Sequence, residues 1–158
     1  EELWKGYTRP AILKGKFPLS VPSDRKVYLT SVRDMGRIAG TCIAKKDDIG
    51  KIINVAGDLL SAEQIASTFA EAQKSPCTHS NAKILAFLSR LFFRDLYEII
   101  RFYRRSTETT DIVSLAAKFE GLLTDFASFL DETEWENTDL TFDNFTKKAE
   151  IQVTNTMC

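Results

Sequence analysis

The sequence predicts a mixed fold of α/β origin, effectively α+β in these residues, with two or three short strands and five or six helices. Runs of β-branched and aromatic residues at 27–32 and 51–56 are typical of strands. Apolar residues that recur every three or four positions after residues 34 and 82 indicate amphipathic helices. The 158 residues are 44% hydrophobic and 27% charged, as expected of a globular domain.

Charge and cysteine content exclude several classes of protein. Lys and Arg total 21 and Asp and Glu total 22, and this balance argues against direct nucleic-acid binding. No run of about 18 uncharged apolar residues occurs, so we expect no membrane-spanning helix. Cys42, Cys77 and Cys158 form no CxxC motif, which argues against a zinc knuckle. We interpret them as reduced thiols of an intracellular protein, two of them packed and one on the tail.

The first 60 residues predict loops, two strands and one helix. Glycines and prolines at 6–26 are too frequent for a regular element, so this segment is predicted as loop. A strand follows at 27–32, and Asp34 is placed to cap the next helix. One apolar face of that helix is predicted to comprise Met35, Ile38, Ala39, Cys42 and Ile43. A second strand is predicted at 51–56, between two glycines.

The start of the next helix carries the best-defined local signal. Ser61 and Gln64 fit a capping box, and Leu60 and Ile65 fit the hydrophobic staple around it. The predicted helix continues to about residue 74, where Pro76 prevents its continuation.

A long helix is predicted at 83–105, with a break near residues 94–95 left open. Its aromatic residues cover more than one face, so the surplus must be buried against another helix, a partner or a pocket. We therefore expect a substrate or partner surface that comprises Phe92, Phe93, Tyr97, Phe102 and Tyr103. The arginines of the same segment are interpreted as a solvated face. Further short helices are predicted at 111–118, 122–130 and 142–149.

Catalytic motifs are sparse. His79 is the only histidine, and we interpret it as a strand or loop residue rather than a general base. Cys77 and His79 together supply two ligands, whereas zinc normally takes at least three, so no metal site is predicted. No GxSxG, HExxH, GxxxxGK[ST], GxGxxG or GxxGxxG occurs. No catalytic or cofactor-binding residue is therefore predicted in this chain.

Several segments taken together resemble the C-terminal half of an NmrA-like protein, an atypical branch of the short-chain dehydrogenase superfamily. Residues 27–39 resemble that family's signature of a strand, Asp-Ile-Gly and a helix of small residues. Residues 50–61 resemble its signature of Gly-Lys, a strand, Ala-Gly-Asp and Leu-Thr/Ser. Residues 91–103, then 111–112 and then 123–126 resemble its helical end. Residues 3–6 and 14–16 resemble the loop after that family's Phe-Met-Glu-Asn turn.

The resemblance covers about residues 1–135 and leaves 136–158 as a C-terminal helix and frayed tail. It implies a Rossmann half, absent from this chain, that binds NADP(H), and edge strands here that complete the large sheet. The implied function is that of an NADP(H)-dependent oxidoreductase or an NADP redox-sensing regulator, cytoplasmic, or nuclear if it is a co-regulator. The implied partner is a small-molecule substrate or a regulatory protein. A stand-alone helical interaction domain without cofactor is the alternative.

Overall fold

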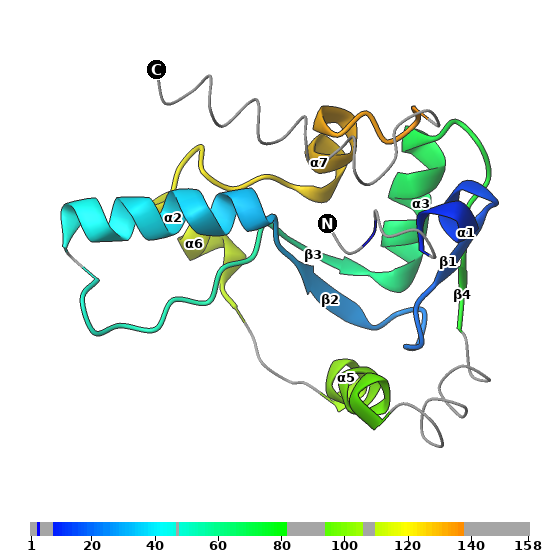
Figure 1. Cartoon of the computed structure of the whole chain (residues 1–158), viewed down its shortest axis with the longest axis horizontal. Helices are drawn as coiled ribbons and strands as arrows, with labels where there is room; N and C mark the ends of the chain where they lie inside the picture. The colour runs from blue at the N-terminus through cyan, green and yellow to red at the C-terminus, as the bar shows by residue number, and fades with distance from the viewer. Residues whose placement is uncertain (1–2, 4–7, 47, 82–93, 106–109, 138–158) are drawn as a thin grey trace.

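A computed structural model of the 158-residue chain shows six helices and four short strands among the residues that it describes: 3, 8–46, 48–81, 94–105 and 110–137 (Figure 1). In chain order the elements are α1 (Arg9–Leu13), β1 (Lys16–Pro18), β2 (Lys26–Leu29), α2 (Val32–Lys45), β3 (Asp58–Ser61), α3 (Ala62–Ala72), β4 (Thr78–Ser80), α5 (Arg94–Arg105), α6 (Ile112–Lys118) and α7 (Phe126–Glu132). The mixed α+β class is confirmed, with one strand more than predicted. No helix among these residues is long and apolar enough to cross a membrane.

The strands form two separate pairs. β1 and β4 are parallel, with Phe17 opposite His79, and β2 and β3 are antiparallel, with Val27 opposite Leu60. β1 and α1 lie where the sequence predicted only loop, so that prediction was wrong. The prolines occupy positions that tolerate them: Pro10 lies in the first turn of α1 and Pro18 ends β1.

The second strand lies later in the sequence than predicted. Residues 51–56 pair with no strand among the described residues, whereas β3 begins at Asp58. The register is set at Gly57, whose N–H donates to the Leu29 carbonyl (2.8 Å). A Cβ at Gly57 would lie 2.2 Å from the carbonyl oxygen of Thr124, so only glycine fits where these segments meet.

Helix α2 corrects two further predictions. It begins at Val32 with Ser31 as the N-cap, so Asp34 lies inside the first turn and does not cap the helix. Of the predicted inward face, Ile38 is buried and Cys42 half-buried, but Met35, Ala39 and Ile43 are exposed. The described residues therefore cover only part of the apolar side of α2.

The capping box of α3 is confirmed. The Ser61 hydroxyl accepts a hydrogen bond from the Gln64 N–H (3.1 Å), and the Gln64 side-chain oxygen accepts one from the Ser61 N–H (2.8 Å). The helix ends at Ala72, slightly before the predicted end, and Lys74 then adopts a left-handed conformation. Helix α3 buries Ile65, Ala66 and Phe69 in the main core.

Aromatic rings build that main core. Phe69 is fully buried, and its ring centroid lies 5.6 Å from that of Phe17, 5.1 Å from that of Phe126 and 4.8 Å from that of Trp135. A smaller second cluster joins Ile38 of α2 to residues of the α6 region. Its buried members are Ile38, Leu115 and Phe119.

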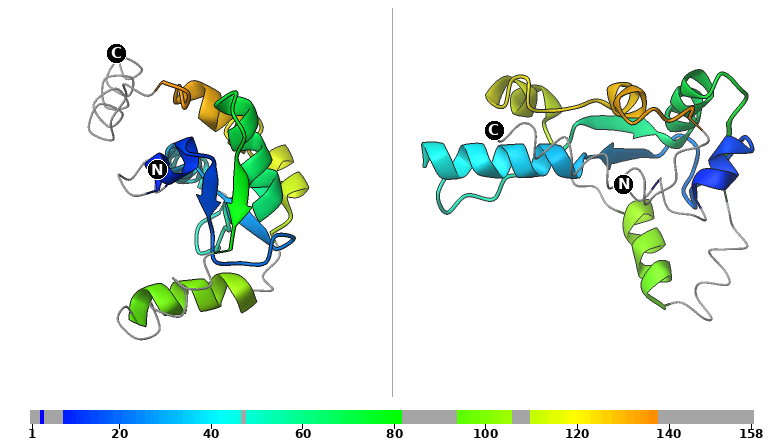
Figure 2. Two further views of the ribbon diagram at one scale, coloured as in Figure 1. Left: turned by 90° about the vertical axis from the view of Figure 1, so that its right-hand side faces the viewer. Right: turned by 45° about the horizontal axis from the view of Figure 1, so that its top comes forward.

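The later helices agree with the sequence in part. Helix α6 matches the predicted 111–118, and Asp111 caps it through the Ser114 N–H (3.1 Å). Helix α7 begins at Phe126, four residues later than predicted, because Leu122 and Leu123 pack in a loop against the second cluster. Helix α5 lies on the opposite side of the molecule from α7 (Figures 1 and 2). The predictions at 83–93 and 142–149 lie outside the described residues.

Candidate functional site

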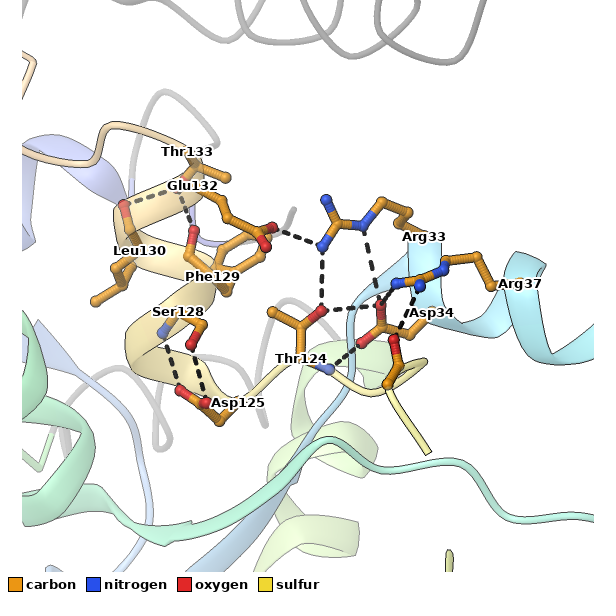
Figure 3. A network of polar contacts seen from close by, with 11 residues as sticks. Arg33, Asp34, Arg37, Thr124, Asp125, Ser128, Phe129, Leu130, Glu132 and Thr133 are labelled. Atoms are coloured by element: carbon orange, nitrogen blue, oxygen red, sulfur yellow. Dashed lines mark hydrogen bonds and ion pairs between the residues drawn. The ribbon is translucent and has the colours of Figure 1, made fainter. Parts of the chain in front are cut away.

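Asp34 is the centre of a buried polar junction between α2 and the segment before α7. Its carboxylate is fully buried, and its two oxygens accept hydrogen bonds from the Thr124 N–H (2.7 Å) and hydroxyl (3.0 Å). Two guanidinium groups flank it, because Arg33 and Arg37 each lie 3.9 Å from the carboxylate. Figure 3 shows Arg33 and Arg37 flanking Asp34, and Asp34 and Arg33 in contact with Thr124. A buried charge is tolerated where it is paired and hydrogen-bonded in this way.

The two arginines also tie α2 to the far side of the junction. Arg33 donates to the Thr124 hydroxyl (3.1 Å) and to the Glu132 carboxylate of α7 (2.6 Å). Arg37 donates to the Gly121 carbonyl (2.9 Å). The orientation of α2 is therefore fixed at its N-terminal half.

A second carboxylate joins the start of β3 to the same segment. Asp58 accepts from the Phe126 N–H (3.2 Å) and from the Leu59 N–H (2.8 Å). With Gly57 packed against the Thr124 carbonyl, three distant segments meet at residues 124–126. We call this set, Asp34, Gly57, Asp58 and Thr124, the junction.

A cleft lies beside the junction. Its walls come from the end of β2, the start of α2 and the start of α7. It is lined by Leu3, Leu29, Thr30, Ser31, Thr124, Asp125, Phe126 and Phe129. Apolar side chains form much of this lining, and Asp125 is engaged as the N-cap of α7 through the Ser128 N–H (2.9 Å). Hydrogen bonds from Ser128 hold the pKa of Asp125 below its usual range.

These residues do not supply catalytic or metal chemistry of their own. Both junction carboxylates are engaged by backbone N–H groups, which leaves neither placed as a general base. No cluster of three metal-ligating side chains occurs among the described residues. The strand-to-helix turn at Thr30 and Ser31 has no glycine to admit a pyrophosphate, so the chain does not fit NADP(H) here.

Exposed apolar side chains also lie on one side of α2 and on the segment after it. Val32, Met35 and Ile43 are 50–77% exposed, and Ile49 and Ile52 are 77% and 95% exposed. Steps of three, four and four residues place Val32, Met35, Ala39 and Ile43 on one side of the helix. The chain turns back after α2 and runs beside it (Figures 1 and 2). We call Val32, Met35, Ala39, Ile43, Ile49 and Ile52 the open face.

The predicted aromatic surface is described only in part. Phe92 and Phe93 lie outside the described residues, and Tyr97 is half-buried. Phe102 and Tyr103 are 56% and 40% exposed, with ring centroids 5.8 Å apart. Helix α5 is held to the loop before β2 by Arg104, which donates to the Ser20 carbonyl (2.9 Å), and by Arg25, which donates to the Tyr103 carbonyl (3.1 Å).

The other residues considered for chemistry have structural partners. His79 lies in β4, and its Nε2 is 2.7 Å from the Leu19 carbonyl oxygen. Cys77 is buried, and burial raises the pKa of its thiol. His79 therefore lies in a strand, one of the two positions that the sequence suggested for it.

The sequence analysis missed the open face and the role of Asp34. One signal for the open face was available, because the apolar arc of α2 includes Val32 as well as the five residues assigned inward. No local signal could have paired Asp34 with Thr124, since 90 residues separate them.

No family model matches this chain, and no curated protein matches it.

Proposed function

We propose that this chain is the substrate- or partner-facing part of an NmrA-like protein, either an NADP(H)-dependent oxidoreductase or an NADP redox-sensing regulator. The observation that carries the proposal is the junction. Three of the stretches that carry the family resemblance contribute to it: Asp34 from 27–39, Gly57 and Asp58 from 50–61, and Thr124 from 123–126.

The junction also explains why those residue types stand at those positions. Asp34 and Asp58 each accept a hydrogen bond from a backbone N–H of residues 124–126, and a glycine is required at 57 by the Thr124 carbonyl. Conserving such a junction would preserve the relative placement of α2 and α7 around the cleft. The motif is therefore structural in this proposal, and no residue here is assigned to catalysis.

The open face is an argument for a second part of the protein that binds the nucleotide. Residues 51–56 have the composition of a strand, yet they pair with no described strand and leave Ile52 95% exposed. Exposed apolar surface and unpaired backbone of this kind are typical of interfaces. We propose that the Rossmann half inferred from the resemblance covers this surface, and that 51–56 is an edge strand of its sheet.

The proposal assigns chemistry and recognition to different parts of the protein. Any hydride transfer needs a nicotinamide site, which these residues do not fit, and a proton donor outside them. A redox sensor would need only a different contact with this part in each cofactor state. The cleft and the surroundings of the junction would then face a small-molecule substrate or a regulatory protein, in the cytoplasm or, for a co-regulator, in the nucleus.

One observation favours the alternative of a helical interaction domain without a cofactor. Phe102 and Tyr103 are 56% and 40% exposed on α5, a helix that lies apart from α2 (Figure 1). Exposed aromatic side chains are enriched in protein interfaces. A partner bound there would require no nucleotide.

The test is to determine the coding sequence upstream of residue 1 and to express all that it encodes together with these residues. The proposal expects a glycine-rich GxxGxxG turn between a strand and a helix, and saturable NADPH binding by the longer protein. A Tyr and a Lys four residues apart would favour the oxidoreductase, and the glycines alone the sensor. An upstream sequence without the turn, or a longer protein that binds no NADPH, would refute the proposal.

A matched pair of variants links that result to the open face. In the longer protein, Ile43→Asp places a charge on the proposed interface and should weaken NADPH binding or the association of the two halves. Val113→Asp makes the same kind of change at a side chain that is 81% exposed on α6, and should not. Equal behaviour of the two variants would argue against the interface.

A further inference from the structure

The two hydrophobic clusters divide the described structure into two lobes. The main lobe is built around the main core and comprises α1, the strands, α3 and α7. The second cluster joins α2 to residues on 53–55 and 115–123. We call α2, residues 48–56 and residues 112–123 the side lobe. No described residue belongs to both clusters, so each lobe has a core of its own.

Three stretches of chain connect the lobes directly, and they lie side by side at the junction. β2 continues into α2 through residues 30–31, and the side lobe returns to β3 through Gly57 and to α7 through residues 124–125. The Gly57 N–H donates to the last residue of β2 (2.8 Å), and a Cβ at Gly57 would meet the carbonyl of residue 124. The remaining connection, after α5, arrives next to β2, where the Thr110 N–H donates to the Tyr28 hydroxyl (2.6 Å). Short stretches at the ends of elements are where hinges form, because a few residues there absorb the change in backbone angles.

Arg33 makes a contact that the other charged side chains at the start of α2 do not make. Arg37 donates to the carbonyl of residue 121 in its own lobe (2.9 Å), and Asp34 accepts from residue 124 in the connecting stretch (2.7 Å). Arg33 also reaches across to the main lobe, where it donates to the Glu132 carboxylate of α7 (2.6 Å; Figure 3). Both side chains of this ion pair are 46% exposed. The start of α2 is therefore held to α7 by a contact that water and salt can reach.

The cleft lies along the boundary between the two lobes. Its apolar wall belongs to the main core or packs against it, and consists of Leu3, Leu29, Phe126 and Phe129. Its polar wall lies in the connecting stretches, and includes Thr30, Ser31 and Thr124. A rotation of the side lobe about these stretches therefore changes the width of the cleft.

We propose that the side lobe turns on a hinge at these connecting stretches, and that the Arg33–Glu132 ion pair is the latch that holds the cleft narrow. When the pair is broken, the start of α2 moves away from α7 and the cleft opens for a ligand to enter or leave. An exposed ion pair is weak and is screened by salt, which suits a contact that must both form and break. The inference rests on the proposed function, because that function gives the cleft a substrate or partner to admit.

The length of α2 makes a small rotation measurable. At 1.5 Å per residue the helix is about 21 Å long, so a rotation of about 20° at its start moves Ile43 by about 6 Å. The 158-residue chain is labelled with spin labels at Ile43→Cys on α2 and Glu71→Cys on α3, both exposed. The native thiols are replaced by Cys42→Ser, Cys77→Ala and Cys158→Ser. Double electron–electron resonance then measures the distribution of distances between the two lobes.

A matched pair of variants isolates the latch. Glu132→Gln removes one charge of the ion pair with little change of shape, and it leaves Arg33 beside Asp34. We expect it to broaden or shift the distance distribution by several ångströms, and about 1 M salt should do the same to the chain that keeps Glu132. Glu136→Gln breaks an exposed ion pair of the same kind, with Lys74 (2.8 Å), that lies outside the side lobe. This control should leave the distribution unchanged, and circular dichroism shows whether each variant is folded.

A second measurement follows the cleft itself. Ser31→Cys, without spin labels and with the native thiols replaced, places a single thiol in the lining of the cleft. The rate at which N-ethylmaleimide modifies it reports how far the cleft is open. Glu132→Gln should raise this rate about two- to fivefold, the range for an exposed ion pair, and Glu136→Gln should not.

Three results would overturn the inference: a distance distribution that neither Glu132→Gln nor salt alters, an equal change in Glu136→Gln, or a cleft thiol whose rate of modification does not follow the latch. The salt series needs no charge variant, so the test stands even if Glu132→Gln does not fold. None of these results bears on whether the upstream sequence encodes a nucleotide-binding turn. The inference and the proposed function can therefore fail separately.

Discussion

The region around α3 and α7 and the arm formed by α2 use their apolar residues differently. Around α3, Phe69 is enclosed by the rings of Phe17, Phe126 and Trp135. On α2, Ile38 is buried against the second cluster, while Met35 and Ile43 remain exposed on the adjoining side. Apolar periodicity thus indicates a helix in both places, but it indicates burial within the chain in only one.

The largest effect is expected in the region around α3 and α7. Phe69→Ala removes a fully buried ring that contacts three other rings, so we expect the free energy of unfolding to fall by about 3–5 kcal/mol. Urea denaturation followed by circular dichroism measures the change. Ile43→Ala on α2 is the matched comparison, and a change within about 0.5 kcal/mol is expected because that side chain is 77% exposed. Comparable losses in the two variants would remove the distinction between the regions.

The next effect is expected at the junction, where the two regions meet. Asp34→Ala leaves the buried N–H of Thr124 without its acceptor, so we expect a loss of about 2–3 kcal/mol in the free energy of unfolding. Replacing a residue that only caps a helix would lower the free energy of unfolding by about 1 kcal/mol. Urea denaturation measures the loss.

A double-mutant cycle identifies the contact that is responsible. Thr124→Val removes the hydroxyl that donates to Asp34 (3.0 Å), so the two substitutions should couple by about 0.5–3 kcal/mol. Additive effects would mean that Asp34 stabilises α2 without Thr124. Glu120→Ala, at an exposed residue near the same loop, is the control and should not couple with Asp34→Ala.

The parts of the fold that depend on neighbouring residues were predictable from the sequence. The Ser61–Gln64 capping box and helix α6 lie where their local patterns place them. The strand at 51–56 was predicted from composition, but a strand exists only where another strand pairs with it. In the described structure that pairing begins at Asp58, after the Gly57 N–H has reached Leu29.

The candidate site was less predictable, for the same reason. Aspartate is a common N-cap residue, and Asp34 lies near the start of a helix. Only its hydrogen bond with Thr124, 90 residues away, shows that it connects two segments instead of capping α2. Phe102 and Tyr103, which the sequence assigned to a substrate or partner surface, are 56% and 40% exposed, and that assignment stays a prediction. The open face was not, because Met35 and Ile43 continue the spacing of Ile38 and Cys42, and spacing alone does not tell which part of an apolar arc meets the core.

A smaller effect is expected at the start of α7, in the region around α3 and α7. Asp125→Ala removes the N-cap bond to the Ser128 N–H and should lower the free energy of unfolding at pH 7 by about 1 kcal/mol. Because the pKa of Asp125 is held below the ordinary value of 3.8, its contribution is present above that pH and is lost as the pH falls through the lowered pKa. Urea denaturation at pH 7 and pH 3 measures both effects.

Asp125→Asn separates the cap from the charge. Asparagine still caps a helix but does not titrate, so this variant should keep most of the stability at pH 7 and lose the acid dependence that Asp125 contributes. If Asp125→Asn and the wild type respond equally to acid, another carboxylate carries the effect.

The smallest change in stability, and the sharpest contrast, is expected between two neighbouring residues of the arm. Ile52 is 95% exposed, whereas Ile53 packs against the second cluster with Ile38 and Leu115. Ile52→Ser should leave the free energy of unfolding within about 0.5 kcal/mol, while Ile53→Ser should cost about 1–3 kcal/mol. Fluorescence of a hydrophobic dye should fall in Ile52→Ser, because apolar surface is lost where solvent can reach it. If both variants lose the same free energy of unfolding, residues of this chain cover Ile52 in solution. The apolar side chains of the arm would then be buried within the chain, as they are around Phe69.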